Sequence, residues 1–266
     1  MFYVAMLLAS VHANIRGVNT YDSLPATDTN ETSVLAAARY MAEYLLPYGY
    51  DTLVIDGGWY DGDGPEDISL DTYGRPLPWP ERFPRGFKAL AADVHALGIK
   101  LGAWLMRGIP VKAVAGRWPI LGSSFTADEA ARKDRNCSWS GENLGTNAPS
   151  AAATAYLASI AALWAEWQLD FVKIDCMYGP GRPGDPVSRA CCTARLLVAS
   201  SVILQPCALP LQVYHEDLVA FSEAMAAVGV PVSLSPGSWV TPTNGSVIAA
   251  GRYAVAYRVT QDLVSV

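Results

Sequence analysis

Two kinds of segment alternate along the chain: stretches with a helical spacing of apolar residues, and short apolar runs that end in a polar residue. The first stretch places Leu35, Ala38 and Ala42 on one face of a helix, and the apolar run at 51–56 follows it. The same pairing recurs with helices at 87–97, 156–167 and 218–228, and with strands at 99–106, 170–175 and 230–235. Further strands are predicted at 14–19 and 253–260.

Strands that alternate with amphipathic helices predict a parallel sheet, either doubly wound or closed as a barrel. Neither a G-x-G-x-x-G motif after the first strand nor a Walker-type loop is present, which disfavours the nucleotide-binding, doubly wound version. Polar residues stand at or just past the carboxyl ends of the strands, where barrel enzymes build their sites: Asp56, Arg107, Asp175, Ser235 and Asp262. We therefore expect an α/β fold of the (β/α)8 TIM-barrel type, incomplete, with about six of the eight units present.

The alternation of side chains within a strand sorts these residues by face. Lys173 and Asp175 share one face of their strand, while the residues between them point to the helix layer. The same alternation places Asp56 on the inner face of its strand and puts Arg258 on one face with Asp262. These charged side chains are therefore expected to converge on the barrel mouth.

The composition narrows the class of protein. A hydrophobic content of 51% with 17% charged residues indicates a well-buried core. The net charge is −6 and no Lys/Arg cluster is present, so we expect neither a nucleic acid nor a membrane as partner. The three histidines have no metal-ligand spacing, and we expect no metal and no cofactor. The eight Trp and thirteen Tyr fit core packing, and also a sugar-binding cleft.

Two carboxylates across a barrel mouth suit retaining glycoside hydrolysis, in which one attacks the anomeric carbon and the other protonates the leaving oxygen and then activates water. Lys173 beside Asp175 would hold the nucleophile in its ionised form, and Arg258 would bind the substrate or Asp262. Two alternatives stay open. The charges could form a salt-bridged ring in a carbohydrate-binding barrel without catalysis, or Lys173 could form a Schiff base as in aldolases.

Several motifs resemble the clan D, family 27 glycoside hydrolases, the melibiase-type α-galactosidases, and they follow that family's order from about residue 14 to residue 262. They are R-G-V-N-T-Y-D at 16–22, L-L-P-Y-G-Y-D-T-L-V-I-D at 45–56, Y-G-R at 73–75, R-F-P at 82–84, G-F-K-A-L at 86–90, W-A-E-W-Q-L-D-F-V-K-I-D-C at 164–176, S-L-S-P-G at 233–237 and Y-R-V-T-Q-D at 257–262. The resemblance implies a retaining exo-glycosidase that hydrolyses terminal α-D-galactosyl residues by double displacement.

The resemblance also assigns residues to roles. Asp175 matches the family nucleophile and Asp262 its acid/base, with carboxyl groups expected at roughly 5–6 Å. The expected substrate-binding residues are Asp56, Trp59, Trp104, Arg107, Lys173, Ser235 and Arg258. A disulfide between Cys137 and Cys176, at the rim of the site, is implied by the family's cysteine placement.

Two positions depart from the family pattern. Val18 replaces a sugar-stacking Trp, and Gly57 stands where many α-galactosidases carry a second aspartate that reaches the O4/O6 side of galactose. The motif W-L-M-R-G-I-P at 104–110 is closer to a plant and bacterial subgroup, some of whose members resemble β-L-arabinopyranosidases. A β-L-arabinopyranoside is an α-galactoside without its C6 hydroxymethyl group, so the sequence leaves both activities open.

The remaining expectations concern the organisation of the chain. Residues 1–13 are a candidate signal peptide, and secretion or delivery to a vacuole or lysosome is expected. Residues 14–266 form the predicted catalytic barrel, with an atypical insertion at about 178–213 that is either a lid or sequence foreign to the fold. The family's last two strand–helix units and its β-sandwich have no counterpart, so we expect the chain by itself to be weakly active or inactive.

Overall fold

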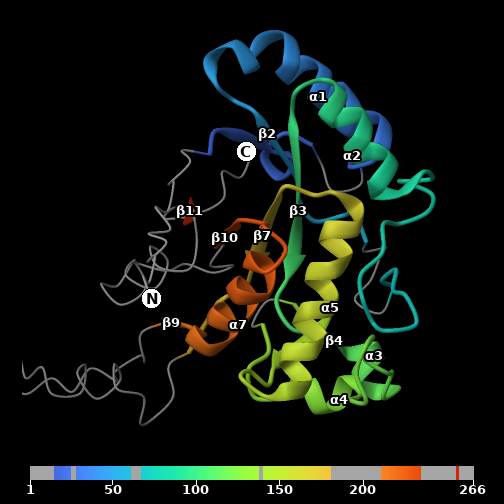
Figure 1. Cartoon of the computed structure of the whole chain (residues 1–266), viewed down its shortest axis with the longest axis vertical. Coiled ribbons are helices and arrows are strands. Elements are labelled where there is room, and N and C mark those ends of the chain that lie inside the picture. Colours follow the sequence, from blue (N-terminus) through green and yellow to red (C-terminus); the bar gives the residue numbers. More distant parts are fainter. Residues whose placement is uncertain are drawn as a thin grey trace, which may run out of the picture.

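The central feature of the computed structural model is a six-stranded sheet in which every neighbouring pair is parallel (Figure 1). The structure describes residues 15–24, 28–60, 67–137, 140–180, 211–234 and 256–257. The strand order β1-β2-β3-β7-β10-β11 follows the order along the chain. Their bounds are Gly17–Asn19, Thr52–Ile55, Lys100–Met106, Phe171–Asp175, Val232–Leu234 and Ala256–Tyr257. All six predicted strands are therefore present.

The four predicted helices are present as well: α1 (Glu31–Tyr44), α2 (Gly86–Ala96), α5 (Ala151–Trp167) and α7 (His215–Ala226). Local chemistry sets where they begin and end. The side chain of Asn30 accepts a hydrogen bond from the backbone of Ser33 at the start of α1, and Ser150 caps α5 in the same way. Gln168 ends α5 in the left-handed conformation.

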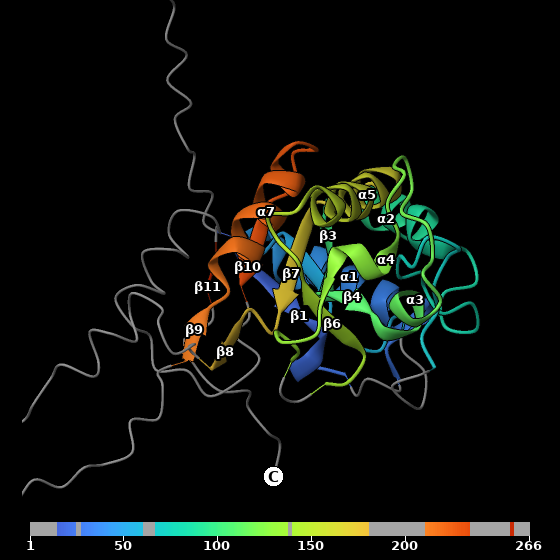
Figure 2. The same ribbon diagram turned by 90° about the horizontal axis from the view of Figure 1, so that it is seen from below.

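The main hydrophobic core fills the space between the strands and these helices. Outward-facing strand residues such as Leu53, Leu101 and Val172 are fully buried against it. A cluster of aromatic rings lies at its centre, with the ring centroids of Trp59 and Phe87 4.9 Å apart. Figure 2 shows α2, α5 and α7 together on one side of the strands. Sequential parallel strands with helices on one face are the arrangement of a (β/α)8-type barrel, because a doubly wound sheet carries helices on both faces.

A small unit between β3 and α5 was not predicted. It consists of a three-stranded antiparallel sheet in the order β4-β6-β5 and two short helices. The bounds are β4 Ile109–Pro110, α3 Val111–Ala115, α4 Ala127–Ala130, β5 Ala131–Arg132 and β6 Asn143–Thr146. Elements of two to five residues are too short for hydrophobic periodicity to reveal, so only tertiary packing defines them.

The ends of the predicted insertion lie side by side. Strands β8 (Tyr178–Pro180) and β9 (Leu211–Val213) pair in antiparallel fashion, so the chain leaves the end of β7 and returns to the start of α7 through one ribbon. The residues between them lie outside the described part of the chain, as does the candidate signal peptide at 1–13. None of the helices within the described residues is long and apolar enough to cross a bilayer.

Candidate active site

Three neighbouring strands bring the predicted polar residues together at their carboxyl ends. Strands β2 and β7 flank β3, and in the register of β3 and β7 Trp104 lies beside Lys173. Asp56 follows the last residue of β2, and Asp175 is the last residue of β7. The side chains of these four residues meet on the inner face, as the alternation predicted.

Asp56 and Lys173 form a buried ion pair. The Lys173 Nζ donates to Asp56 Oδ2 at 2.5 Å, and the side-chain amide of Asn19 donates to the same oxygen at 2.7 Å. The backbone N–H of Gly57 donates to the other oxygen, Asp56 Oδ1, at 2.8 Å. The Lys173 Nζ is therefore engaged by a carboxylate rather than free to attack a carbonyl carbon, so the geometry does not favour the Schiff-base alternative.

Asp175 is 7% exposed and both of its carboxylate oxygens accept hydrogen bonds. The Trp104 indole Nε1 donates to Oδ2 at 2.9 Å, and the backbone N–H of Cys176 donates to Oδ1 at 2.6 Å. Burial raises the pKa of Asp175, while the Trp104 hydrogen bond and the Lys173 charge act in the opposite direction. The Lys173 charge therefore favours the ionised form, as expected, while burial is the larger influence on the pKa.

Asn19 belongs to the R-G-V-N-T-Y-D motif at 16–22 but was not among the predicted site residues. Asn19 is the last residue of β1 and lies beside Val54 in the register of β1 and β2. It therefore shares the inner face with Asp56, and applying the alternation argument to β1 would have identified it. Tyr21, just beyond it, is 52% exposed, and its ring centroid lies 5.9 Å from the Lys173 ammonium.

Trp59 does not line the site. Its side chain is fully buried on the helix side of the sheet, where it contacts Phe87, Trp164 and Trp167, and its indole N–H donates to the carbonyl oxygen of Trp104 at 2.7 Å. Trp59 comes four residues after the end of β2, where strand alternation no longer determines direction. The expectation that Trp59 binds substrate is therefore wrong, while Trp104 remains at the mouth.

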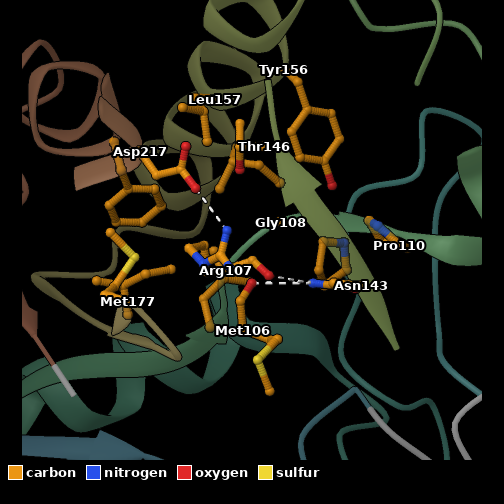
Figure 3. Close-up of a pocket in the computed structure, with 15 residues that line it drawn as sticks. Met106, Arg107, Gly108, Pro110, Asn143, Thr146, Tyr156, Leu157, Met177 and Asp217 are labelled. Atoms are coloured by element: carbon orange, nitrogen blue, oxygen red, sulfur yellow. Dashed lines mark hydrogen bonds and ion pairs between the residues drawn. The ribbon is translucent and has the colours of Figure 1, made fainter. Parts of the chain in front are cut away.

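Arg107 also points away from the mouth. Trp104 and Met106 share the inner face of β3, so Arg107 has the opposite parity and extends toward the helix layer. Its guanidinium Nη1 donates to Asp217 Oδ2 on α7 at 2.7 Å (Figure 3). The central carbon of the guanidinium lies 4.0 Å from the ring centroid of Tyr214. The expectation that Arg107 binds substrate is therefore wrong, and the alternation argument, carried one residue past the strand, would have corrected it.

A cavity beside Arg107 lies between β3, β7, α5 and α7 rather than at the mouth (Figure 3). Its lining is mostly apolar and includes Leu105, Leu157, Ile160 and Phe221. Because it faces the helix layer, it is a gap in the core and does not adjoin the carboxylates of the candidate site. Within the described residues, no group of three or more His, Cys, Asp or Glu side chains is placed to hold a metal ion.

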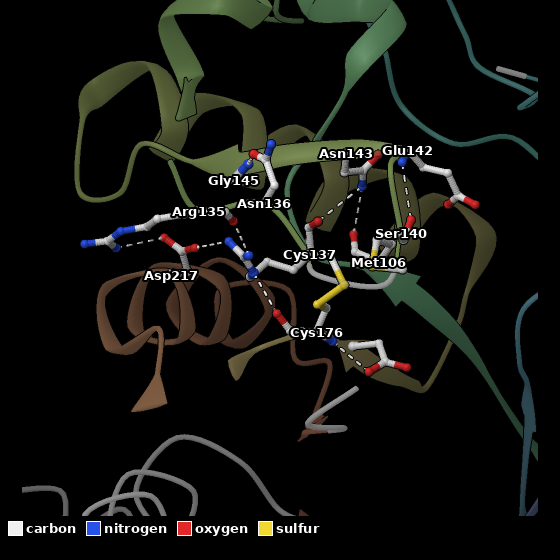
Figure 4. The surroundings of a disulfide bond; sticks show 12 residues. Met106, Arg135, Asn136, Cys137, Ser140, Glu142, Asn143, Gly145, Cys176 and Asp217 are labelled. Carbon is white, nitrogen blue, oxygen red and sulfur yellow. Dashed lines mark hydrogen bonds and ion pairs between the residues drawn. A yellow bond between two sulfur atoms is a disulfide. The ribbon is translucent and has the colours of Figure 1, made fainter. Parts of the chain in front are cut away.

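A disulfide joins Cys137 to Cys176, the pair implied by the resemblance, with Cα atoms 5.8 Å apart. Figure 4 shows the bond connecting the segment of Asn136 and Cys137 to the end of β7. It anchors the residue directly after Asp175 to the small antiparallel unit. Ser235, Arg258 and Asp262 lie outside the described residues, so the predicted facing of Asp175 and Asp262 stays a prediction.

Comparison with known proteins finds partial matches among glycosidases. No protein-family model matches the chain. Alpha-galactosidase 3 of Hypocrea jecorina is 27% identical over 146 residues, covering 54% of this chain and 21% of that protein. The alpha-N-acetylgalactosaminidase of Gallus gallus is 30% identical over 134 residues, covering 50% of this chain and 23% of that protein.

The fold comparison covers more of the chain. A glycoside hydrolase family 27 β-L-arabinopyranosidase from Geobacillus stearothermophilus, solved in complex with arabinose, is 29% identical with a TM-score of 0.74. The match covers 94% of this chain and 54% of that protein, so this chain spans about half the length of that structure. In sequence the chain is therefore similar to part of an α-galactosidase and of an α-N-acetylgalactosaminidase, and in fold and sequence to about half of a family 27 glycoside hydrolase.

Proposed function

We propose that this chain forms the catalytic barrel of a retaining exo-glycosidase that hydrolyses terminal α-D-galactosyl residues, with Asp175 as nucleophile. The observation that carries the proposal is the environment of Asp175. It is a buried carboxylate at the carboxyl end of a barrel strand, oriented by two N–H donors, beside the Asp56–Lys173 pair. Perturbed carboxyl groups in such positions are typical of catalytic residues.

In the proposed reaction, a carboxylate oxygen of Asp175 attacks the anomeric carbon and the bond to the leaving oxygen breaks. Asp262 donates a proton to that oxygen, and then accepts a proton from the water that hydrolyses the glycosyl ester. Donation by Trp104 and Cys176 fixes the direction of the attacking carboxylate. We further propose that Asp56 and Lys173 bind ring hydroxyls, since both groups remain polar at the mouth after pairing.

Gly57 favours a second candidate activity, that of a β-L-arabinopyranosidase with the same mechanism. A Cβ atom on Gly57 would have no heavy atom of the described residues within 4 Å, so this part of the chain leaves the space directly after Asp56 open. With no side chain in that space, no contact from this position selects for a C6 hydroxymethyl group. The similar protein from Geobacillus stearothermophilus is a β-L-arabinopyranosidase, which supports testing the two sugars together.

A covalent probe and two chromogenic substrates test the proposal. The full-length protein is treated with a galacto-configured cyclitol epoxide, whose ring is opened by a carboxylate to give a stable ester, and the labelled peptide is found by mass spectrometry. We expect the label on Asp175, and hydrolysis of nitrophenyl α-galactoside, nitrophenyl β-L-arabinopyranoside or both. Absence of label and of hydrolysis would favour the carbohydrate-binding barrel without catalysis.

We also propose that the protein follows the secretory route, to the outside of the cell or to a vacuole or lysosome. A disulfide such as Cys137–Cys176 is typical of proteins that fold in oxidising compartments. We propose as well that residues 1–13 are removed. The mass of the mature protein isolated from its source, and thiol labelling without reductant, test both points. An unprocessed amino terminus with two free thiols would contradict them.

A further inference from the structure

The residue that follows the proposed nucleophile has an unusual backbone. Cys176 has φ of +56°, in the left-handed region that residues other than glycine rarely adopt. The N–H of this same residue donates to Asp175 Oδ1, so Cys176 supplies one of the two hydrogen bonds that orient the carboxylate. Such conformations persist where the surroundings hold them in place.

Arg107 holds this peptide from two sides. Its backbone N–H donates to the carbonyl oxygen of Asp175 at 3.2 Å, and its side-chain Nε donates to the carbonyl oxygen of Cys176 at 2.8 Å. Consecutive carbonyl groups on either side of the strained residue are therefore bonded to a single arginine. The disulfide to Cys137 is a third attachment at the same residue.

Arg107 is itself held in place by buried partners. The side chains of Arg107 and Asp217 are 3% and 2% exposed. A second nitrogen of the Arg107 guanidinium donates to the carbonyl oxygen of Arg135. Figure 4 shows Asp217 and Arg135 beside the disulfide. Because Asp217 lies in the first turn of α7, this ion pair links the helix layer to the peptide behind the nucleophile. A planar guanidinium bonded on several edges has little freedom to move.

We propose that Arg107, paired with Asp217, is a positioning residue that fixes the Cys176 peptide and thereby the direction of the Asp175 carboxylate. This inference rests on the proposed function, because it assigns Arg107 and Asp217 a part in the reaction although neither contacts the substrate. Proposed catalytic groups of this kind must be held within about 0.5 Å of their working geometry. Arg107 lies outside the mouth, but its bonds to two consecutive carbonyl groups hold the Cys176 peptide, and with it the Asp175 carboxylate, in a fixed position.

The test compares three variants of the full-length protein. Arg107→Met removes both the side-chain hydrogen bond and the pair, and the double variant Arg107→Met with Asp217→Leu replaces the pair by apolar groups. Replacing both members of a buried ion pair is often neutral for stability, so the double variant is expected to fold. Arg75→Met is the matched control, because Arg75 also pairs with an aspartate, Asp71, and donates to a backbone carbonyl, but at Ser159, away from the nucleophile.

The readouts are the first-order rate of labelling by the cyclitol epoxide, protection against labelling by free galactose or arabinose, and the thermal midpoint. We expect the double variant to label roughly 10²-fold more slowly, with half-protection at a nearly unchanged sugar concentration. The acid limb of its labelling rate should move to higher pH, because losing the Cys176 N–H bond destabilises the Asp175 carboxylate. Asp56 and Lys173, the charged groups that face Asp175 within the described residues, stay in place in all three variants.

The outcomes separate this inference from the function on which it rests. A wild-type protein that is not labelled overturns the proposed function and this inference with it. A labelled wild type with a double variant that folds and labels at the wild-type rate overturns this inference alone. Equal slowing in Arg75→Met would likewise overturn it, because the effect would then follow from general destabilisation.

Discussion

Two clusters of buried charge lie on opposite faces of the same strands, and they differ in whether the buried carboxylate, Asp175 in one and Asp217 in the other, has a direct counter-ion. The mouth cluster consists of Asp56, Lys173 and Asp175 on the inner face, and the outer cluster of Arg107 and Asp217 on the helix side. In the outer cluster Asp217 Oδ2 pairs directly with the Arg107 guanidinium, which also donates to the carbonyl oxygen of Cys176. In the mouth cluster Asp175 has no counter-ion in direct hydrogen-bond contact among the described residues, and only N–H donors orient it.

The difference shows how neighbouring residues can acquire unlike roles. Met106 and Arg107 are consecutive, as are Asp175 and Cys176, and each step along the chain moves the side chain to the other face. Burial raises the pKa of both Asp175 and Asp217, but Asp217 faces the Arg107 guanidinium at 2.7 Å. A direct ion pair such as Arg107–Asp217 stabilises the packing of the strands and helix that carry it, whereas a carboxylate without a direct counter-ion, such as Asp175, is available to react.

The largest expected effect is a loss of activity in the mouth cluster without a matching loss of stability, and the opposite in the outer cluster. We expect Asp175→Asn to lower kcat/KM at least ~10³-fold, because the nucleophile is removed. Its free energy of unfolding should change by only about 1 kcal/mol, since a lost hydrogen bond is offset by no longer burying a charge. Asp217→Asn should instead lose about 3 kcal/mol, because it leaves a buried arginine unpaired. Urea unfolding and steady-state kinetics measure both, and a reversed pattern would contradict the comparison.

A second test concerns the ion pair inside the mouth cluster. Lys173→Met leaves the Asp56 carboxylate unpaired and should cost about 3 kcal/mol of stability together with ~10²-fold in kcat/KM. Adding Asp56→Asn should restore most of the stability but not the activity, because the proposed contacts to sugar hydroxyls are gone. Recovery of activity in the double variant would show that the pair is structural, like the outer cluster.

The pH dependence of Asp175 sharpens the contrast further. Because burial raises its pKa, the folded protein binds a proton at pH values where the unfolded chain has released it. This contribution to stability is present below the unfolded pKa and is lost as the pH rises through the folded pKa. Trp104→Phe removes a donor to the carboxylate, so the acid limb of kcat/KM should move to higher pH. An unchanged limb, measured between pH 3 and 8, would show that Trp104 does not influence this group.

The smallest effect is expected at Gly57, the mouth position without a side chain. Gly57→Asp fills open space and offers a carboxylate on the side where the proposed substrates differ. We expect the ratio of α-galactoside to β-L-arabinopyranoside hydrolysis to rise roughly tenfold, as for the gain of one polar contact. Gly57→Ala is the control, since it adds volume without an acceptor. The same change of ratio in both variants would attribute selectivity to shape alone.

Much of the fold followed from local patterns. Six strands and four helices were predicted at their observed places, because apolar periodicity reports burial within each regular element. The same alternation placed Asp56, Lys173 and Asp175 on one face. Beyond the end of a strand, the alternation no longer predicts which way a side chain points. Trp59 lies past the end of β2, and its side chain is buried in the core. Strands β4 and β5 have two residues each, too few to show a hydrophobic periodicity.

The sequence by itself therefore determined the six strands of the main sheet and its four long helices, which of their residues share a face, and, through its motifs, the family resemblance. Only the tertiary structure decided the partners: Lys173 with Asp56, Trp104 and Cys176 with Asp175, and Arg107 with Asp217. Those pairs join residues up to 117 positions apart. Local periodicity depends on neighbours three or four residues away, whereas such contacts depend on how strands align and on which helix covers them.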